Sequence, residues 1–344
     1  MIAKLVTQPE LDAWVDALIG EQTVYGPQAK GDRFAFDPLR SAAELRLDYD
    51  VSMLPPGKYF QPPRETLMTF NETGEFQRVI ERDPFVVFGV HPYDFVAIAQ
   101  LDKIFATGAP DAHYLARREA ATVVVSDVQN ASPNVFAGAM GFATVEHRKG
   151  YDVLMTRLDD GRTVVEPRTP KGETLLAGLA KARHVDVDGI RAREAVWARN
   201  RKTLQKHKLK MEPERIPEVL AQSRHHPVWE EKAALCYSCG SCNLVCPTCY
   251  CFTVEDELHW DMKSGERTRS WDGCMLTHFA TVAGEHNFRP RKSARYRHRY
   301  YRKGKYVPDL IGESACVGCG RCVTACTANI ANPAEVFNRL LEEQ

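Results

Sequence analysis

Cys236-Tyr-Ser-Cys239-Gly-Ser-Cys242-Asn-Leu-Val-Cys246-Pro247 is the stretch that decides the fold, and Cys316-Val-Gly-Cys319-Gly-Arg-Cys322-Val-Thr-Ala-Cys326-Thr327 repeats its spacing. In both stretches the cysteines are separated by two, two and three residues, and no cysteine precedes Cys236. This spacing is typical of a pair of [4Fe–4S] clusters. Three cysteines of one run bind each cluster together with the last cysteine of the other run.

We therefore predict two [4Fe–4S] clusters and no catalytic residue in this chain. The predicted ligands of cluster one are Cys236, Cys239, Cys242 and Cys326. Those of cluster two are Cys316, Cys319, Cys322 and Cys246. Disulfides would suit a small secreted domain, and a zinc ribbon would need two separated C-x2-C pairs. This long chain shows no signal peptide, which argues against disulfides, and its cysteines form runs of four rather than separated pairs, which argues against a zinc ribbon.

The length of 344 residues predicts two domains. Hydrophobic residues make up 44% and charged residues 26% of the chain, which is ordinary for a globular protein. The formal net charge is zero, so no global field draws the chain to nucleic acid or to a membrane. The expected fold class is α+β. A mixed α/β domain is expected over residues 1–215, and a mainly α-helical, dicluster ferredoxin-like domain over residues 216–344.

Strands and helices alternate in the N-terminal part. Thr7-Gln8-Pro9-Glu10 reads as a capping box at the start of a helix. The pattern predicts further elements: strands over 85–90 and 121–125, a hairpin over 152–158 and 163–166, and helices over 94–105 and 189–207. The proline-rich segment 54–64 is expected to be a surface loop.

The N-terminal domain contains neither a G-x-G-x-x-G fingerprint nor a P-loop. A flavin site without a short motif stays open. Two functions are therefore compared. The favoured one is an electron-transfer protein that carries the two clusters, and the alternative is a flavin-dependent oxidoreductase with its own active site in this domain. The flavin content of the purified protein would discriminate between them. Of three histidines considered, only His91, at the end of an apolar strand, stands where a site is plausible. His225 and His226 are expected to be ordinary polar residues.

A basic stretch separates the two cysteine runs. Residues 289–305 hold nine Lys or Arg, three tyrosines and no acid. Basic and aromatic residues together occur in proteins that bind single-stranded nucleic acid. We favour another role and expect no nucleic-acid partner. Clusters with cysteine ligands carry net negative charge, which the basic stretch would offset, and it could also dock an acidic partner.

Three cysteines belong to neither run: Cys249, Cys251 and Cys274. The favoured interpretation is that they are small buried side chains, as free cysteines commonly are. The alternative is a third metal centre with a fourth ligand from Asp272, His278 or a partner.

The stretch from Cys236 to Cys251 resembles the iron–sulfur beta subunit of cytoplasmic NAD(P)-linked nickel–iron hydrogenases (sulfhydrogenases), and also the A subunit of anaerobic sulfite reductase. The resemblance continues through Trp271-Asp-Gly-Cys274, where the family usually has Ser at the third position, and through Gly284–Pro290 and Cys316–Cys322. Weaker similarity lies upstream, in 62–65, 88–91 and 111–119.

This resemblance implies an electron-transfer subunit between two partners: a flavin- and NAD(P)-binding reductase subunit, and a catalytic redox subunit of the hydrogenase or sulfite-reductase kind. Similar proteins carry additional cysteines near the positions of His91 and Val135. This chain has none there, so we expect no N-terminal cluster. No apolar run is long enough for a membrane span, and the first residues lack the apolar core of a signal peptide. We expect a cytoplasmic protein.

Overall fold

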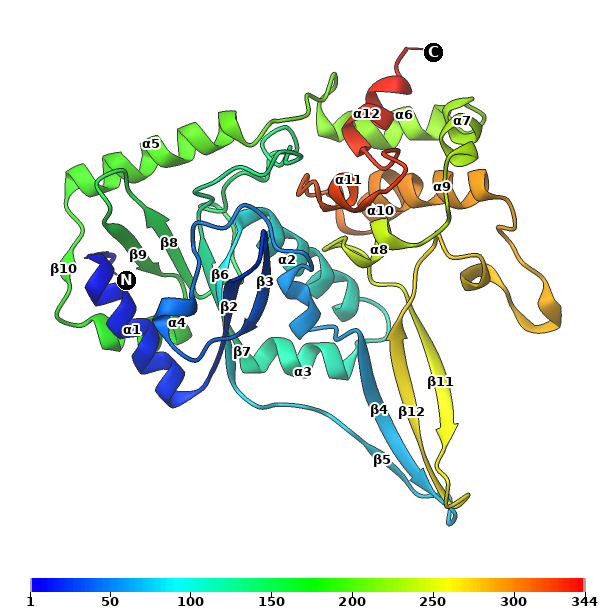
Figure 1. Ribbon diagram of the computed structural model, residues 1–344, viewed down its shortest axis with the longest axis horizontal. Helices are drawn as coiled ribbons and strands as arrows, with labels where there is room; N and C mark the ends of the chain where they lie inside the picture. The colour runs from blue at the N-terminus through cyan, green and yellow to red at the C-terminus, as the bar shows by residue number, and fades with distance from the viewer. Residues whose placement is uncertain (1, 343–344) are drawn as a thin grey trace.

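The computed structural model describes residues 2–342. Figure 1 shows the N-terminal part built around one large sheet and the C-terminal part built from short helices. The predicted α+β fold class is confirmed. The boundary expected near residue 215 stays a prediction. Strands from both sides of it share a second sheet.

The large sheet has eight strands in the order β10-β1-β9-β8-β7-β6-β2-β3. The pairs β2–β6, β6–β7 and β7–β8 are parallel, and the remaining pairs are antiparallel. The strands are β1 (Lys4–Val6), β2 (Thr23–Lys30), β3 (Arg33–Pro38), β6 (Phe85–Val90), β7 (Ala121–Ser126), β8 (Val153–Arg157), β9 (Thr163–Pro167) and β10 (Arg183–His184).

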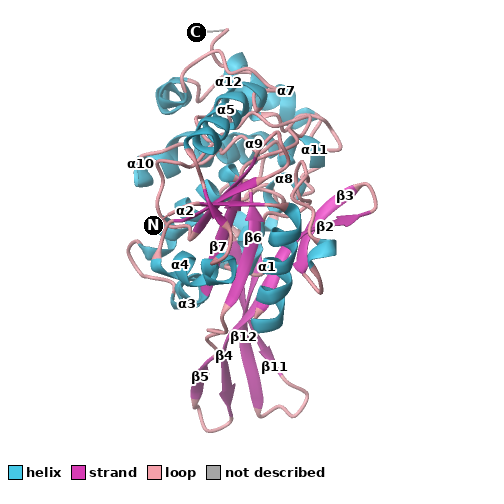
Figure 2. Ribbon diagram, turned by 90° about the vertical axis from the view of Figure 1, so that its left-hand side faces the viewer, coloured by secondary structure: helices cyan, strands magenta, loops and turns pink. Residues whose placement is uncertain are grey.

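Helices cover both faces of this sheet (Figure 2). They are α1 (Gln8–Glu21), α2 (Pro92–Ala106), α3 (Ala112–Ala120), α4 (Pro170–Leu175) and α5 (Val187–Thr203). The expected capping box starts α1, whose apolar side packs with Val86 and Phe88 on one face. The apolar side of α2 packs with Val87 and Val123 on the other face. Alternating β6 residues thus serve two separate cores, as the two-residue period of a strand requires.

The C-terminal helices are short and surround the cysteine loops. They are α6 (Ile216–Gln222), α7 (Val228–Ala234), α8 (Ser241–Leu244), α9 (Lys292–Tyr301), α10 (Val307–Ile311), α11 (Arg321–Ala325) and α12 (Pro333–Arg339). A π-helical turn over Arg302–Tyr306 joins α9 to α10. None of the helices within residues 2–342 has the length and apolar character needed to cross a membrane.

A second sheet of four strands, ordered β11-β12-β4-β5, extends away from the body (Figure 1). Its strands are β4 (Arg64–Asn71), β5 (Phe76–Arg78), β11 (Phe252–Leu258) and β12 (Ser264–Trp271). The sequence patterns do not predict this sheet. It pairs β4 of the N-terminal part with β12 of the segment between the two cysteine runs.

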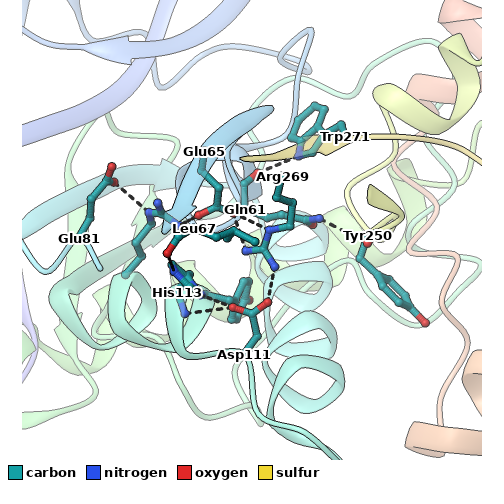
Figure 3. A network of polar contacts seen from close by, with 11 residues as sticks. Gln61, Glu65, Leu67, Glu81, Asp111, His113, Tyr250, Arg269 and Trp271 are labelled. Carbon is teal, nitrogen blue, oxygen red and sulfur yellow. Dashed lines mark hydrogen bonds and ion pairs between the residues drawn. The ribbon is translucent and has the colours of Figure 1, made fainter. Parts of the chain in front are cut away.

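A buried ion-pair network anchors the base of this second sheet (Figure 3). Arg269 of β12 donates to Glu65 of β4 and to Asp111 at the start of α3. Arg117 of α3 also donates to Glu65. Because these charges are buried, removing any one partner would leave an uncompensated charge, and the network joins residues from both parts of the chain.

The proline-rich segment 54–64 is not the expected surface loop. Pro56–Tyr59 forms a 3-10 turn, Phe60 is completely buried and Gln61 is 3% exposed. The ring of Phe60 packs near those of Phe85 and Tyr114. A buried aromatic side chain within the segment, Phe60, therefore draws it into the core, which the proline content did not indicate.

Candidate metal centres

The first cavity of interest is bordered by Cys236, Cys239, Cys242 and Cys326, with Met275, Tyr296 and Ile330 among its other lining residues. It encloses about 410 Å³ of space, part of it open to solvent. Two backbone N–H groups donate to the sulfurs: that of Ser238 lies 3.3 Å from Cys236 Sγ, and that of Ile330 lies 3.5 Å from Cys326 Sγ. The structure thus brings together the four cysteines predicted for cluster one.

The second cavity is bordered by Cys246, Cys316, Cys319 and Cys322 and encloses about 430 Å³, again partly open. These are the four cysteines predicted for cluster two. Arg299, Lys303 and Phe136 also line this cavity. That the two quartets bind iron stays a prediction.

The two loops share one backbone pattern, which follows from their common spacing. The residue before the second cysteine has a positive φ in both loops: 54° at Ser238 and 69° at Gly318. So does the residue after that cysteine, with 75° at Gly240 and 77° at Gly320. Left-handed residues turn the loop sharply, so that the first two cysteines of each run and the third, in the first turn of α8 or α11, border one cavity.

The second loop is packed directly against the N-terminal part. The N–H of Phe136 donates to the carbonyl of Gly318 at 2.7 Å. A Cβ at Gly320 would lie 2.3 Å from the backbone oxygen of Asn134, so the close approach requires glycine there. Arg321 forms a bidentate ion pair with Asp94 of α2, at 2.5 and 2.7 Å. The sequence reasoning missed this pair, because nothing local to either residue marks the other as its partner.

The two quartets differ in exposure. Cys239 of the first quartet is exposed, whereas Cys319 and Cys322 of the second are buried. Burial raises the pKa of Cys319 to about 11 and that of Cys316 to about 12. Without iron these thiols are neutral at pH 7. Iron binds the thiolate, so binding a cluster would release their protons.

The basic stretch turns much of its charge inward. Arg295 is 3%, Arg299 4% and Lys303 8% exposed. Arg295 donates to the hydroxyl of Ser238 in the first loop at 3.1 Å. Burial would lower the pKa of Arg299, but the neighbouring sulfurs of Cys242 and Cys322 raise it well above its ordinary value. Arg299 therefore lies within electrostatic reach of both cavities.

These residues fit an anionic cluster in each cavity. Four sulfurs border each space, and Arg299 Nη1 is buried with no hydrogen-bond partner among residues 2–342. A buried guanidinium with an open donor is costly unless negative charge lies beside it. A cluster held by four thiolates supplies such charge.

Comparison with known proteins agrees with this geometry. A family model described as a 4Fe-4S dicluster domain matches residues 235–330. Sulfhydrogenase 2 subunit beta of Pyrococcus furiosus is 32% identical over 309 residues, an alignment that covers 89% of each chain. No solved structure matches the chain. On the extent of this similarity, the chain belongs to the family of the sulfhydrogenase beta subunits.

Proposed function

We propose that this chain is the electron-transfer iron–sulfur subunit of a cytoplasmic oxidoreductase complex. In this proposal Cys236, Cys239, Cys242 and Cys326 bind one [4Fe–4S] cluster, and Cys316, Cys319, Cys322 and Cys246 bind the other. The supporting observation is that these quartets border two separate cavities, each completed by a cysteine from the opposite run. Exchange of the fourth ligand keeps two clusters close together, which permits one-electron transfer between them.

The protein's own contribution is to hold the clusters and to set their potentials. Positive charge beside a cluster favours its reduced form, which carries the additional electron. Arg299 is placed to act on both clusters, and Lys303 on cluster two. The Ser238 and Ile330 N–H groups act in the same direction at cluster one.

The exposed side of cluster one is the proposed point of exchange with a partner. Cys239 is exposed, and its neighbours Tyr237 and Leu235 are 74% and 62% exposed. A partner that covers these side chains would bring its own redox centre close to cluster one. Cluster two lies behind it, against the N-terminal part.

The proposed partners are a flavin- and NAD(P)-binding reductase subunit and a catalytic redox subunit of the hydrogenase or sulfite-reductase kind. The support is the name of the similar protein, which is one subunit of a sulfhydrogenase. Nucleic acid is not a proposed partner, because three cations of the basic stretch point inward rather than toward solvent.

Replacing Cys239 by alanine should remove cluster one. The iron content should fall by about four atoms per chain relative to the parent. The C-terminal part should also lose stability, because cluster binding contributes to its folding. Iron and sulfide analysis of anaerobically purified protein, with EPR spectra of the reduced state, measures this. The control is Tyr237→Phe, two residues away, which should keep the parental iron. Equal iron in Cys239→Ala and the parent would contradict the proposal.

A further inference from the structure

The three remaining cysteines meet at one place. Cys249, Cys251 and Cys274 line a cavity of about 290 Å³. Cys249 and Cys251 precede β11, and Cys274 follows β12. The two strands pair from Phe252 opposite Trp271, and the N–H of Asp272 donates to the carbonyl of Cys251 at 3.0 Å. The end of this hairpin opposite to its turn therefore holds the three cysteines together.

One buried amide links two of these sulfurs. Asn243 Nδ2 lies 3.4 Å from Cys274 Sγ and 3.6 Å from Cys249 Sγ. Asn243 is 2% exposed, and its Oδ1 accepts from the N–H of Met275 at 3.1 Å. That contact fixes the amide so that its N–H groups face the sulfurs. Such donors commonly orient and tune the sulfur ligands of a metal centre.

Three cations line the same cavity. They are Arg299, Arg302 and Lys303. Lys303 Nζ donates to the Thr248 hydroxyl at 2.7 Å, and Arg302 donates to the Tyr250 hydroxyl. Within residues 2–342 none of the three forms an ion pair with a carboxylate. Cysteines that serve as small hydrophobic residues pack among apolar side chains. A polar, positively charged wall instead fits an anionic occupant, and Arg302, unlike Arg299 and Lys303, does not also line the cavity of cluster two.

We propose that Cys249, Cys251 and Cys274 bind a third iron–sulfur cluster of the [4Fe–4S] type, with Asp272 as the ligand of its fourth iron. Asp272 is 9% exposed and lines the adjoining cavity together with Cys249 and Cys251. Within residues 2–342 no group of three His, Cys, Asp or Glu side chains is close enough together to hold a single metal ion. A cubane has a different requirement, because each iron takes its own ligand.

This third centre would extend the electron path of the proposed function. The side chain of Cys249 contacts that of Cys246, the ligand that the first run contributes to cluster two. Arg299 and Lys303 line both cavities. Cluster three would therefore lie next to cluster two and exchange electrons with it.

The test compares iron in the full chain with iron in two matched triple variants. All proteins are purified anaerobically and reconstituted with iron and sulfide. The parent should hold about twelve iron atoms, three clusters of four. Cys249→Ser/Cys251→Ser/Cys274→Ser should hold about eight and keep the EPR components of clusters one and two. The matched variant Cys236→Ser/Cys239→Ser/Cys242→Ser should lose a different component while keeping cluster three.

Two outcomes would overturn the third cluster: a parent with about eight iron atoms, or a Cys249/Cys251/Cys274 variant with the iron and spectrum of the parent. The parental count decides the question even if that variant does not fold. If the Cys236/Cys239/Cys242 variant loses iron and the Cys249/Cys251/Cys274 variant does not, the two-cluster proposal stands without a third cluster. If the Cys249/Cys251/Cys274 variant loses iron and the other does not, the third cluster is supported and the two-cluster assignment is contradicted.

Discussion

Replacing Glu65 by alanine is expected to destabilise the folded chain by about 3–5 kcal/mol, the usual cost of removing one partner from a buried ion pair. Glu65 accepts from both Arg117 and Arg269, and the three side chains are 2%, 4% and 3% exposed. Without Glu65, Arg269 keeps Asp111, and Arg117 keeps Glu81, which is 64% exposed. Two guanidinium groups would then be buried with less negative charge around them.

Urea unfolding of the cluster-loaded protein, followed by circular dichroism, measures this change. The matched control is Glu257→Ala, which breaks the exposed pair with Arg64 on the same sheet. Exposed pairs contribute about 0–1 kcal/mol, so the midpoint should hardly move. Similar shifts for the two variants would show that the Glu65 network does not hold the second sheet to the body.

Replacing Asp94 by alanine should also lower the free energy of unfolding by about 3–5 kcal/mol. It should in addition release cluster two. The partner of Asp94 is Arg321, which stands between Cys319 and Cys322 and is 2% exposed. Arg321 also donates to the carbonyl of Ser52 at 2.8 Å. Loss of the carboxylate leaves a buried cation inside the loop that binds cluster two. The loop is then expected to shift, and the iron content to fall by about four atoms per chain.

Iron analysis and EPR of the reduced protein measure the effect, with the signal of cluster one as internal reference. The double variant Asp94→Leu/Arg321→Met removes both charges together. Replacing a whole buried pair by apolar residues is often neutral, so this variant should keep cluster two. If the double variant loses as much iron as Asp94→Ala, shape rather than charge balance holds the loop.

The cysteine quartets could be grouped from the sequence because their chemistry is local. Three cysteines within seven residues can border one cavity in few ways, and the offset fourth cysteine must then turn to the neighbouring loop. The main strands β6 and β7 were also predictable, since their apolar runs and flanking turns lie within a few residues of each other. The same holds for α1, whose capping box is complete in four residues.

The features that depend on distant partners were not predictable. Asp94 and Arg321 are 227 positions apart, and either one alone reads as an ordinary surface charge. Strand β11 begins with apolar and polar residues in alternation, Phe252, Thr253, Val254 and Glu255, a signal that Asp256 then interrupts. Its sheet partners, however, include β4 far upstream. The inward direction of Arg299 follows from the orientation of α9, which composition does not report.

Anomalous scattering at the iron edge, from crystals grown without oxygen, tests the central proposal most directly. We predict one [4Fe–4S] cluster bound by Cys236, Cys239, Cys242 and Cys326, and another bound by Cys316, Cys319, Cys322 and Cys246. Iron density in which Cys246 joins Cys236, Cys239 and Cys242 would contradict the exchange of fourth ligands. Density of a single metal ion in either cavity would contradict the cluster assignment itself.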